Sequence, residues 1–291
     1  MSQNQTKSQG CPSGNSCGGA SGHGAMAGMQ DKMIESTLSH IKNKFLVMSG
    51  KGGVGKSSIA ANLAMALARQ EKKTGLLDVD LHGPSIATIM GIHEMMDVSP
   101  ENLINPWTFG ENLKVVSLQA LMPDKDAAVI WRGPAKHGVI RQFVADVLWG
   151  DLDYLIIDSP PGTGDEPLSV AQMVTGARAL VVATPQEVAL ADVRKSINFC
   201  SKVNLPIAGL IENMGAFPCP HCGESVNLFP IGTTEAMAKK MNLPFLGSIP
   251  FDPEVVKASD QGMPVADLYP DSPFLAAINR ITDKLVEGAV A

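Results

Sequence analysis

The stretch from Gly50 to Ser57, GKGGVGKS, constrains the fold of this chain more than any other. It fits G-x-x-x-x-G-K-[ST], a loop whose glycines let successive backbone N–H groups surround an anion. The apolar residues 45–48 before it are typical of a buried strand. After it, Ile59 and Leu63 begin an apolar repeat at helical spacing. A strand, a glycine loop and a helix in this order predict a phosphate-binding site rather than a chance glycine-rich turn.

The loop assigns a role to each kind of residue in it. The lysine Lys56 is expected to reach the β- and γ-phosphates, and the hydroxyl of Ser57 is expected to ligate Mg²⁺. The helix that starts here adds the positive end of its dipole to the same place. The residues expected to contact ATP are Gly50, Lys51, Gly52, Gly53, Val54, Gly55, Lys56, Ser57 and Ser58.

The rest of the chain alternates strand-like and helix-like segments. Its 291 residues are 45% hydrophobic and 18% charged, which allows a substantial core. This pattern predicts an α/β fold, a mostly parallel twisted sheet with helices on both faces. Residues 92–112 show no clear period and are predicted to be loop. Strands are predicted at 45–48, 74–80, 113–118, 153–158, 179–184, 206–211 and 245–250, and helices at 31–43, 188–203, 233–242 and 272–287.

The N-terminal 30 residues differ in composition from the rest. Residues 1–30 are rich in Ser, Gly, Gln and Asn and are predicted to form a flexible tail. The ATPase domain is then expected at 31–291. The tail carries Cys11 and Cys17, which are either idle thiols or ligands of a metal or cluster. Five cysteines in a reducing compartment are more often free, metal-bound or redox-active than paired in disulfides.

Charge and hydropathy bound the partners. The net charge of −6 argues against a protein that coats nucleic acid, because that interaction depends on clustered Lys and Arg. No apolar run approaches the length of a membrane helix, and residues 1–30 contain no hydrophobic signal core. The last predicted helix carries few cations on its apolar side, so we expect it to dock on the core rather than on a membrane. We therefore expect a cytoplasmic protein without membrane or nucleic-acid partners.

Carboxylates end two of the predicted strands, where ligands bind in an open α/β sheet. The apolar run that ends at Asp158 matches the strand that holds Mg²⁺ in nucleotide-binding proteins, usually through a water. Asp78 and Asp80 end another strand, and we expect their side chains to face different sides of it. One of them is a candidate partner of Mg²⁺ or of the attacking water. The turn-rich residues 159–165 are predicted to be a switch loop that responds to the γ-phosphate.

A second cysteine pair, Cys219 and Cys222, lies in the CPHC loop near 217–223. A C-x-x-C between Pro and Gly aims two sulfurs at one point, for a metal or cluster, for a redox dithiol, or by coincidence. The setting counts against a redox dithiol, which belongs to a small thioredoxin-like domain. A tetrahedral zinc or a [4Fe–4S] cluster wants four thiolates, and one loop supplies two. A symmetric homodimer would bring two loops together.

The loop sequence resembles the deviant Walker A loop of the MinD/ParA-like class of P-loop ATPases. Taken alone, Lys51 is an ordinary solvated charge, but the resemblance implies that it reaches the partner subunit's nucleotide, so that hydrolysis requires dimerisation. The resemblance also favours Asp80 over Asp78 for the switch role. It implies that Asn213, at the end of a strand, contacts adenine. The catalytic candidates are therefore Lys51, Lys56 and Asp80.

The combination of GKGGVGKSS, LLDVDLHGPS, LIIDSPPGTGD and CPHC resembles the Mrp/ApbC family of iron–sulfur cluster carrier ATPases, over nearly all of residues 44–287. The resemblance implies a homodimer that bridges one [4Fe–4S] cluster through Cys219 and Cys222 of each subunit. It also implies slow ATP hydrolysis coupled to delivery of the cluster to apo iron–sulfur proteins. Some relatives have four N-terminal cysteines, of which Cys11 and Cys17 resemble the last two. The alternative is a MinD/ParA-like positioning ATPase with a structural zinc at CPHC, because spacing alone does not separate zinc from iron–sulfur.

Overall fold

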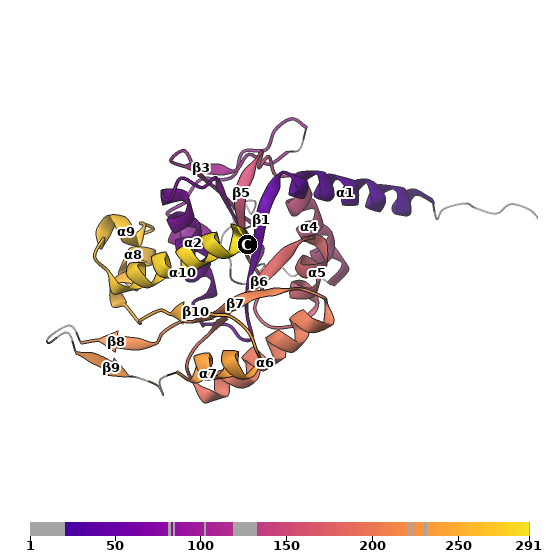
Figure 1. Ribbon diagram of the computed structural model, residues 1–291. Helices are drawn as coiled ribbons and strands as arrows, with labels where there is room; N and C mark the ends of the chain where they lie inside the picture. Colours follow the sequence, from indigo (N-terminus) through magenta and orange to yellow (C-terminus); the bar gives the residue numbers. More distant parts are fainter. Residues whose placement is uncertain are drawn as a thin grey trace, which may run out of the picture.

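The computed structural model describes residues 21–80, 83, 85–101, 103–118, 133–219, 222, 224–227, 229 and 232–290. Its centre is one eight-stranded sheet in the order β10-β7-β6-β1-β5-β2-β4-β3 (Figure 1). Every neighbouring pair is parallel except β3 with β4. The strands are β1 (Ile41–Ser49), β2 (Thr74–Asp78), β3 (Trp107–Phe109), β4 (Leu113–Ser117), β5 (Leu152–Asp158), β6 (Ala177–Ala183), β7 (Ile207–Glu212) and β10 (Phe245–Ser248).

Helices cover both faces of this sheet, and a small hairpin stands apart from it (Figure 1). The hairpin consists of the antiparallel strands β8 (Ala216–Pro218) and β9 (Ser225–Asn227), which pair with each other and not with the main sheet. The helices are α1 (Ser21–Ser39), α2 (Lys56–Arg69), α3 (Ile86–Ile89), α4 (Gly133–Ala145), α5 (Asp165–Met173), α6 (Glu187–Lys202), α7 (Thr233–Lys240), α8 (Pro253–Asp260), α9 (Val265–Leu268) and α10 (Pro273–Val290).

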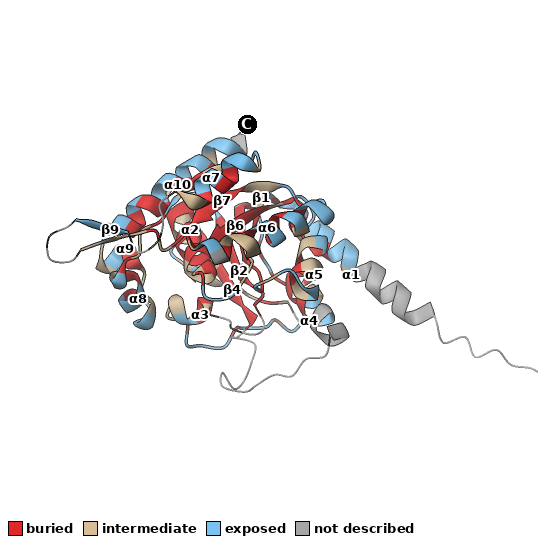
Figure 2. Ribbon diagram, turned by 90° about the horizontal axis from the view of Figure 1, so that it is seen from below, coloured by how far each residue is buried: buried red, intermediate tan, exposed pale blue. Residues whose placement is uncertain are grey.

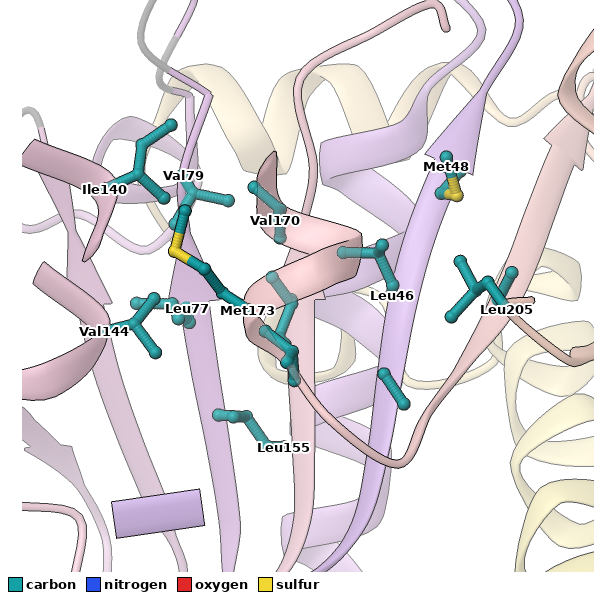
Figure 3. Packing of buried hydrophobic residues seen from close by; sticks show 14 of the residues in the cluster. Leu46, Met48, Leu77, Val79, Ile140, Val144, Leu155, Val170, Met173 and Leu205 are labelled. Carbon is teal, nitrogen blue, oxygen red and sulfur yellow. The ribbon is translucent and has the colours of Figure 1, made fainter. Parts of the chain in front are cut away.

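The sheet divides the core into two apolar layers because successive side chains of a strand point to opposite faces. In β1, Leu46 and Met48 join the layer under α1, α4, α5, α6 and α7, part of which is drawn in Figure 3. Phe45 and Val47 join the layer under α2, α3, α8 and α10. Figure 2 shows the buried strands between helices whose outer sides are exposed. The predicted α/β fold with helices on both faces is confirmed.

The N-terminal helix begins earlier than the sequence predicted. α1 starts at Ser21, inside the segment predicted to be a tail, and ends at Ser39, where 43 was expected. The glycines at 22, 24 and 28 lower the helix propensity of this stretch, which is why composition alone did not indicate a helix. Its buried contacts come later in the chain, from Ile34 and Leu38. Residues 41–43, predicted to be helical, belong to β1 instead.

Two further elements correct or support the sequence predictions. Residues 92–112, predicted to be loop throughout, contain the short edge strand β3. The last helix docks on the core as expected, and the buried side chains of α10 include Leu275, Ile278 and Ile281. Within the described residues, no helix is long and apolar enough to cross a membrane.

The parallel strands bring their carboxyl ends to one edge of the sheet. There β1 leads into the glycine loop, β2 ends at Asp78, β5 ends at Asp158, and β7 leads into Asn213. Ligands of open α/β sheets bind at this edge. The topology therefore brings together the residues that the sequence singled out, although Gly50 and Asn213 lie 163 positions apart along the chain.

Candidate nucleotide site and cysteine hairpin

The glycine loop wraps the start of α2 in a shape that needs glycine at defined positions. Gly53 and Gly55 have φ of +77° and +81°, a left-handed backbone that disfavours any Cβ. Gly50 needs space as well, because an added Cβ would lie 2.5 Å from the backbone oxygen of Asp192 on α6. Lys56 and Ser57 then open α2, so the N–H groups of its first turn point at the loop's interior.

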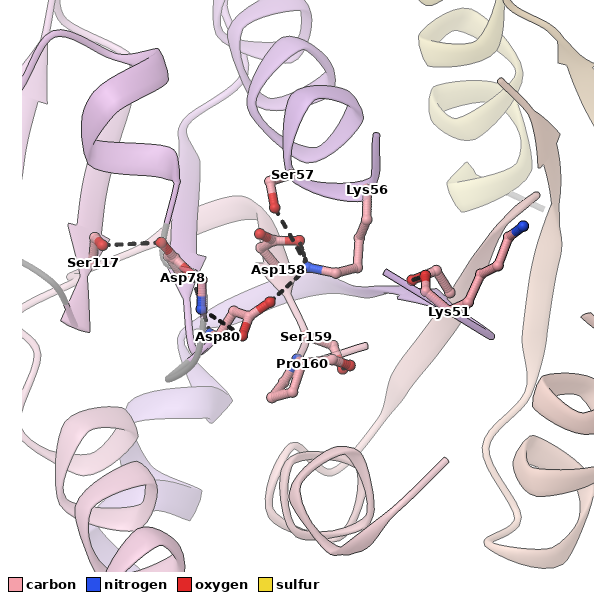
Figure 4. A network of polar contacts seen from close by, with 11 residues as sticks. Lys51, Lys56, Ser57, Asp78, Asp80, Ser117, Asp158, Ser159 and Pro160 are labelled. Atoms are coloured by element: carbon pink, nitrogen blue, oxygen red, sulfur yellow. Dashed lines mark hydrogen bonds and ion pairs between the residues drawn. The ribbon is translucent and has the colours of Figure 1, made fainter. Parts of the chain in front are cut away.

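A buried ion pair lies under the loop (Figure 4). The Nζ of Lys56 donates to Oδ1 of Asp158 at 2.5 Å and is 3.7 Å from Oδ2 of Asp80. The side chains of Lys56 and Asp158 are 6% and 0% exposed, so this charge is held almost without water. Burial raises the pKa of Asp158, and the neighbouring Lys56 ammonium opposes that rise. The charges of Lys56, Asp158 and Asp80 therefore depend on one another, and they lie next to the glycine loop.

The second oxygen of Asp158 marks a place for a cation. Its Oδ2 is buried and accepts no hydrogen bond in the structure. A buried carboxylate oxygen without a partner is costly, so its neighbourhood favours a bound positive charge. Ser57, whose Oγ is 3.5 Å from the Lys56 Nζ, lies beside it. Ser57 and Asp158 could hold Mg²⁺ together, and this role stays a prediction.

Asp78 and Asp80 occupy different environments, but alternation is not the reason, because residues two apart on a strand share a face. The strand β2 ends at Asp78, so Asp80 lies beyond it and can turn to another side. Asp78 is fully buried; its carboxylate accepts from the Ser117 hydroxyl at 2.9 Å and from the backbone N–H of Asp80 at 3.1 Å. Burial and the nearby Asp158 carboxylate raise the pKa of Asp78 to about 8. Asp80 instead lines the cavity described next. Asp78 therefore supports the site from behind, while Asp80 faces it.

A cavity of about 580 Å³ extends from the loop along the sheet edge. One end is polar, formed by the glycine loop with Lys56, Ser57 and Asp80. The other end is apolar and comes from the segment between β10 and α8, from α8 itself and from α10. Its size suits a nucleotide, with phosphates at the polar end and a base against the apolar wall. The apolar wall includes Pro250, Phe251, Val255, Val256 and Phe274.

Sequence reasoning did not identify this wall. Phe251 and Phe274 are isolated aromatic residues in the sequence, more than 190 positions from the glycine loop, and no motif marks them. The turn residues that follow β10 are the one local signal, because β10 is parallel to β7 and its carboxyl end lies at the same edge. The wall is therefore a product of topology rather than of a sequence motif.

Asn213 joins the cavity to the glycine loop. It is 7% exposed, lines the cavity, and donates from Nδ2 to the backbone carbonyl of Val54 at 2.8 Å. Gly55 makes this approach possible, because a Cβ there would lie 2.3 Å from the same nitrogen. In the structure Asn213 thus braces the loop. The contact with adenine that the sequence predicted stays a prediction.

Lys51 lies apart from the buried ion pair. Figure 4 shows its side chain pointing away from Lys56 and Asp158, and its Nζ donates to Gln186 at 3.4 Å. It does not line the cavity of its own chain. The other loop residues named from the sequence, including Ser58, surround that cavity or adjoin it. The role of Lys51 stays a prediction.

The cysteine pair is carried by the separate hairpin. Cys219 follows β8 and Cys222 lies in the turn that leads to β9, and both are thiols rather than a disulfide. The backbone N–H of Cys219 donates to the carbonyl of Glu224, which closes the turn at 2.8 Å. Cys200, in contrast, is buried in the core, where burial raises the pKa of its thiol to about 11. Cys11 and Cys17 lie outside the described residues.

The fold and this site define a P-loop nucleotide-binding protein of the MinD and ParA class. A solved nucleotide-binding protein from Archaeoglobus fulgidus, in complex with ADP, is 40% identical, with a TM-score of 0.72, and the match covers 83% of this chain and 94% of that one. The cell-division ATPase MinD of Pyrococcus furiosus has a TM-score of 0.63 at 24% identity over 84% of this chain and 99% of its own, which shows the shared fold.

Within that class the chain has closer relatives. The model of the NUBPL iron-transfer P-loop NTPases matches residues 40–286. An iron–sulfur cluster carrier protein of Methanocaldococcus jannaschii is 43% identical over 291 residues, 99% of each chain. Another, from Saccharolobus solfataricus, is 45% identical over 258 residues, 88% of this chain and 87% of its own. The chain belongs to this family of iron-transfer P-loop NTPases, and the predicted resemblance is confirmed.

Proposed function

We propose that the protein is an ATP-hydrolysing carrier that holds a [4Fe–4S] cluster between two subunits and transfers it to apo iron–sulfur proteins in the cytoplasm. The observation that carries this proposal is the position of the Cys219–Cys222 pair on a hairpin rooted beside the nucleotide cavity. The names of the relatives from Methanocaldococcus jannaschii and Saccharolobus solfataricus support it.

The donor set argues for two subunits. Among the described residues, no group of three or more His, Cys, Asp or Glu side chains is placed to hold a metal ion. The described part of one chain therefore offers Cys219 and Cys222, whereas the cluster takes four thiolates. A two-fold axis near the hairpin tips would supply the other two. The hairpin stands off the main sheet, so two copies have room to approach each other (Figure 1).

Contacts at the root of the hairpin support coupling between nucleotide and cluster. The rings of Phe217 on β8 and Phe251 are 6.0 Å apart, and Phe251 also lines the nucleotide cavity. The backbone N–H of Phe251 donates to the carbonyl of Ala216 at 3.0 Å. A nucleotide that displaces Phe251 would therefore move β8, and with it the cysteines. The cluster affinity would then change only as far as the cluster binds more tightly in one position of the hairpin than in the other.

The hydrolytic step draws on the residues around the buried ion pair. Lys56 would turn from Asp158 to the phosphates, and Ser57 with Asp158 would hold Mg²⁺, which supplies charge to the phosphate oxygens. Asp80 would orient the attacking water. Lys51, which points away from its own cavity, would reach the nucleotide of the second subunit. Hydrolysis would then require the same dimer that holds the cluster.

Anaerobic reconstitution tests the cluster assignment. The protein is incubated with iron and sulfide, and bound iron, acid-labile sulfide and the visible absorption are measured. We expect four iron and four sulfide per dimer, on the order required by one cubane cluster. Cys219→Ala/Cys222→Ala should lose them, and Cys200→Ala, which removes a core thiol, should keep them.

The outcome also decides between this function and the alternative one. Stoichiometric zinc without a visible chromophore would instead support a positioning ATPase with a structural metal site. Full cluster loading in Cys219→Ala/Cys222→Ala would show that Cys219 and Cys222 are not the ligands. Transfer is then measured as the recovery of activity in an apo iron–sulfur enzyme, with and without ATP.

A further inference from the structure

A second cavity, of about 140 Å³, lies at the root of the cysteine hairpin. It is bounded by the ends of β7 and β10, the start of α7 and the two hairpin strands. Two carboxylates line it, Glu212 at the end of β7 and Glu235 in the first turn of α7. Ser248 and Asn227 add a hydroxyl and an amide. The nucleotide cavity shares none of these residues.

Glu212 is a buried carboxylate, and only one of its two oxygens accepts a hydrogen bond. Its side chain lines the cavity although the residue is 5% exposed. Oε1 accepts from the Ser248 hydroxyl at 2.8 Å, whereas the buried Oε2 accepts no hydrogen bond. Leaving a buried anionic oxygen without a partner costs more free energy than leaving a neutral group. The position of Oε2 therefore calls for a positive charge inside the cavity.

Other buried oxygens gather at the same corner. In the described part of the chain, four buried side-chain oxygens accept or donate no hydrogen bond. One is Oδ2 of Asp158, at the predicted Mg²⁺ site. The other three are Oε2 of Glu212 and the hydroxyls of Thr184 and Thr234, whose chain neighbours line this cavity. The two carboxylates with an orphaned oxygen are thus at different places, and of the two only Glu212 lines this cavity.

The described part of the chain offers no cation to this cavity. No lysine, arginine or histidine is among its described lining residues. Gly215 keeps the space open, because an added Cβ would lie 2.4 Å from Oγ of Ser248 and 3.6 Å from Oε1 of Glu212. The cavity is therefore acidic, lined with oxygen donors, and large enough for an ion with water.

We propose that this cavity binds a hydrated divalent cation of the Mg²⁺ or Mn²⁺ type, with Glu212 as its buried ligand and Glu235 as its exposed one. Carboxylate and water oxygens, without a thiolate or an imidazole, are ligands that suit Mg²⁺ or Mn²⁺. A site with two carboxylates and space for water matches the way such ions bind, because they keep part of their hydration shell. The ion would join β7 and α7 to the base of the hairpin.

This site is separate from the nucleotide and from the cysteines. Glu212 adjoins Asn213, which braces the glycine loop, and Gly215 leads into β8. A cation here fixes the point at which the chain leaves the sheet for the hairpin. It does not require ATP, and it does not use a thiolate.

Manganese titration of the nucleotide-free, full-length protein tests the proposal. Free Mn²⁺ is followed by its EPR signal, with no nucleotide and no iron present. We expect one bound Mn²⁺ per chain in the wild type and in Cys219→Ala/Cys222→Ala. Asp158→Asn should also retain this ion, because Asp158 does not line this cavity. Glu212→Gln and Glu235→Gln should each weaken binding about tenfold or more, since each removes one ligand charge.

Matched controls separate the site from general surface charge. Glu224→Gln makes the same change on the same hairpin outside the cavity and should leave the affinity unchanged. Glu235 is exposed, so its variant is expected to fold even if Glu212→Gln does not. Circular dichroism records the fold of each variant. The proposal is overturned if Mn²⁺ binds only with nucleotide, or if Glu235→Gln binds it as tightly as Glu224→Gln.

Discussion

Replacing Lys56 by methionine tests whether the buried pair under the glycine loop is an electrostatic unit. In the nucleotide-free protein, Lys56→Met removes the ammonium 2.5 Å from Asp158 and leaves a carboxylate with 0% exposure uncompensated. Removing one partner of a buried ion pair costs about 3 kcal/mol or more. For a chain of this size, that lowers Tm by roughly 6 to 12 °C. Thermal unfolding at pH 8, followed by tryptophan fluorescence, measures it.

The double variant gives the sharper result. In Lys56→Met/Asp158→Asn both charges are gone, and replacing a buried pair by neutral groups is often close to neutral. We expect a stability within about 1 kcal/mol of Asp158→Asn alone, which corresponds to a coupling of about 2 kcal/mol or more. Lys42→Met is the control, because Lys42 bonds Asp153 at 2.8 Å with a side chain 74% exposed, and its Tm should equal the wild type's. Additive effects of the two buried substitutions would refute the reasoning.

Three further predictions concern the same edge of the sheet. The raised pKa of Asp78, about 8, means that the folded state holds its proton more tightly than the unfolded state; stability therefore falls as pH rises from about 4 to 8, and Asp78→Asn should flatten that fall in Tm. Gly50→Ala forces a Cβ to within 2.5 Å of the Asp192 backbone and should cost about 2 kcal/mol or more in urea unfolding, whereas Gly52→Ala, which meets nothing within 4 Å, should not; equal losses would contradict the clash. Lys51→Ala should keep ADP affinity in calorimetry but lose ATP hydrolysis, and normal turnover would exclude its action across a dimer.

Residues that act through a local motif could be predicted from the sequence. The glycine loop, Lys56 and Ser57 are contiguous, and Asp158 ends an apolar run, so the motif and the rule that ligands bind at the carboxyl ends of strands place them at one edge. The preference for Asp80 over Asp78 came from family resemblance and agrees with their positions, since Asp80 lines the cavity. A local sequence motif was therefore enough to place a candidate residue when that residue belongs to the motif itself.

The remaining features depend on contacts between distant segments. The apolar wall of the nucleotide cavity needs β10 beside β7, which no short pattern encodes. The strand β3 spans Trp107–Phe109, too short for a period to be visible, and it exists because it pairs with β4. The N-terminal part of α1 was not predicted because its glycines lower the helix propensity of the segment. Glu212 looked like an ordinary strand end until Ser248 and α7 were placed around it.

The separate hairpin also affects how the protein can change over time. Because β8 and β9 make their ladder with each other, a new residue in the CPHC turn leaves every rung of the eight-stranded sheet intact. Substitutions in the turn are thus separated from the strand pairing of the main sheet, whereas Ala216 and Phe217 at the root contact Phe251. Replacing residues of the turn while Ala216 and Phe217 are kept should therefore leave the melting temperature unchanged, as measured by thermal unfolding.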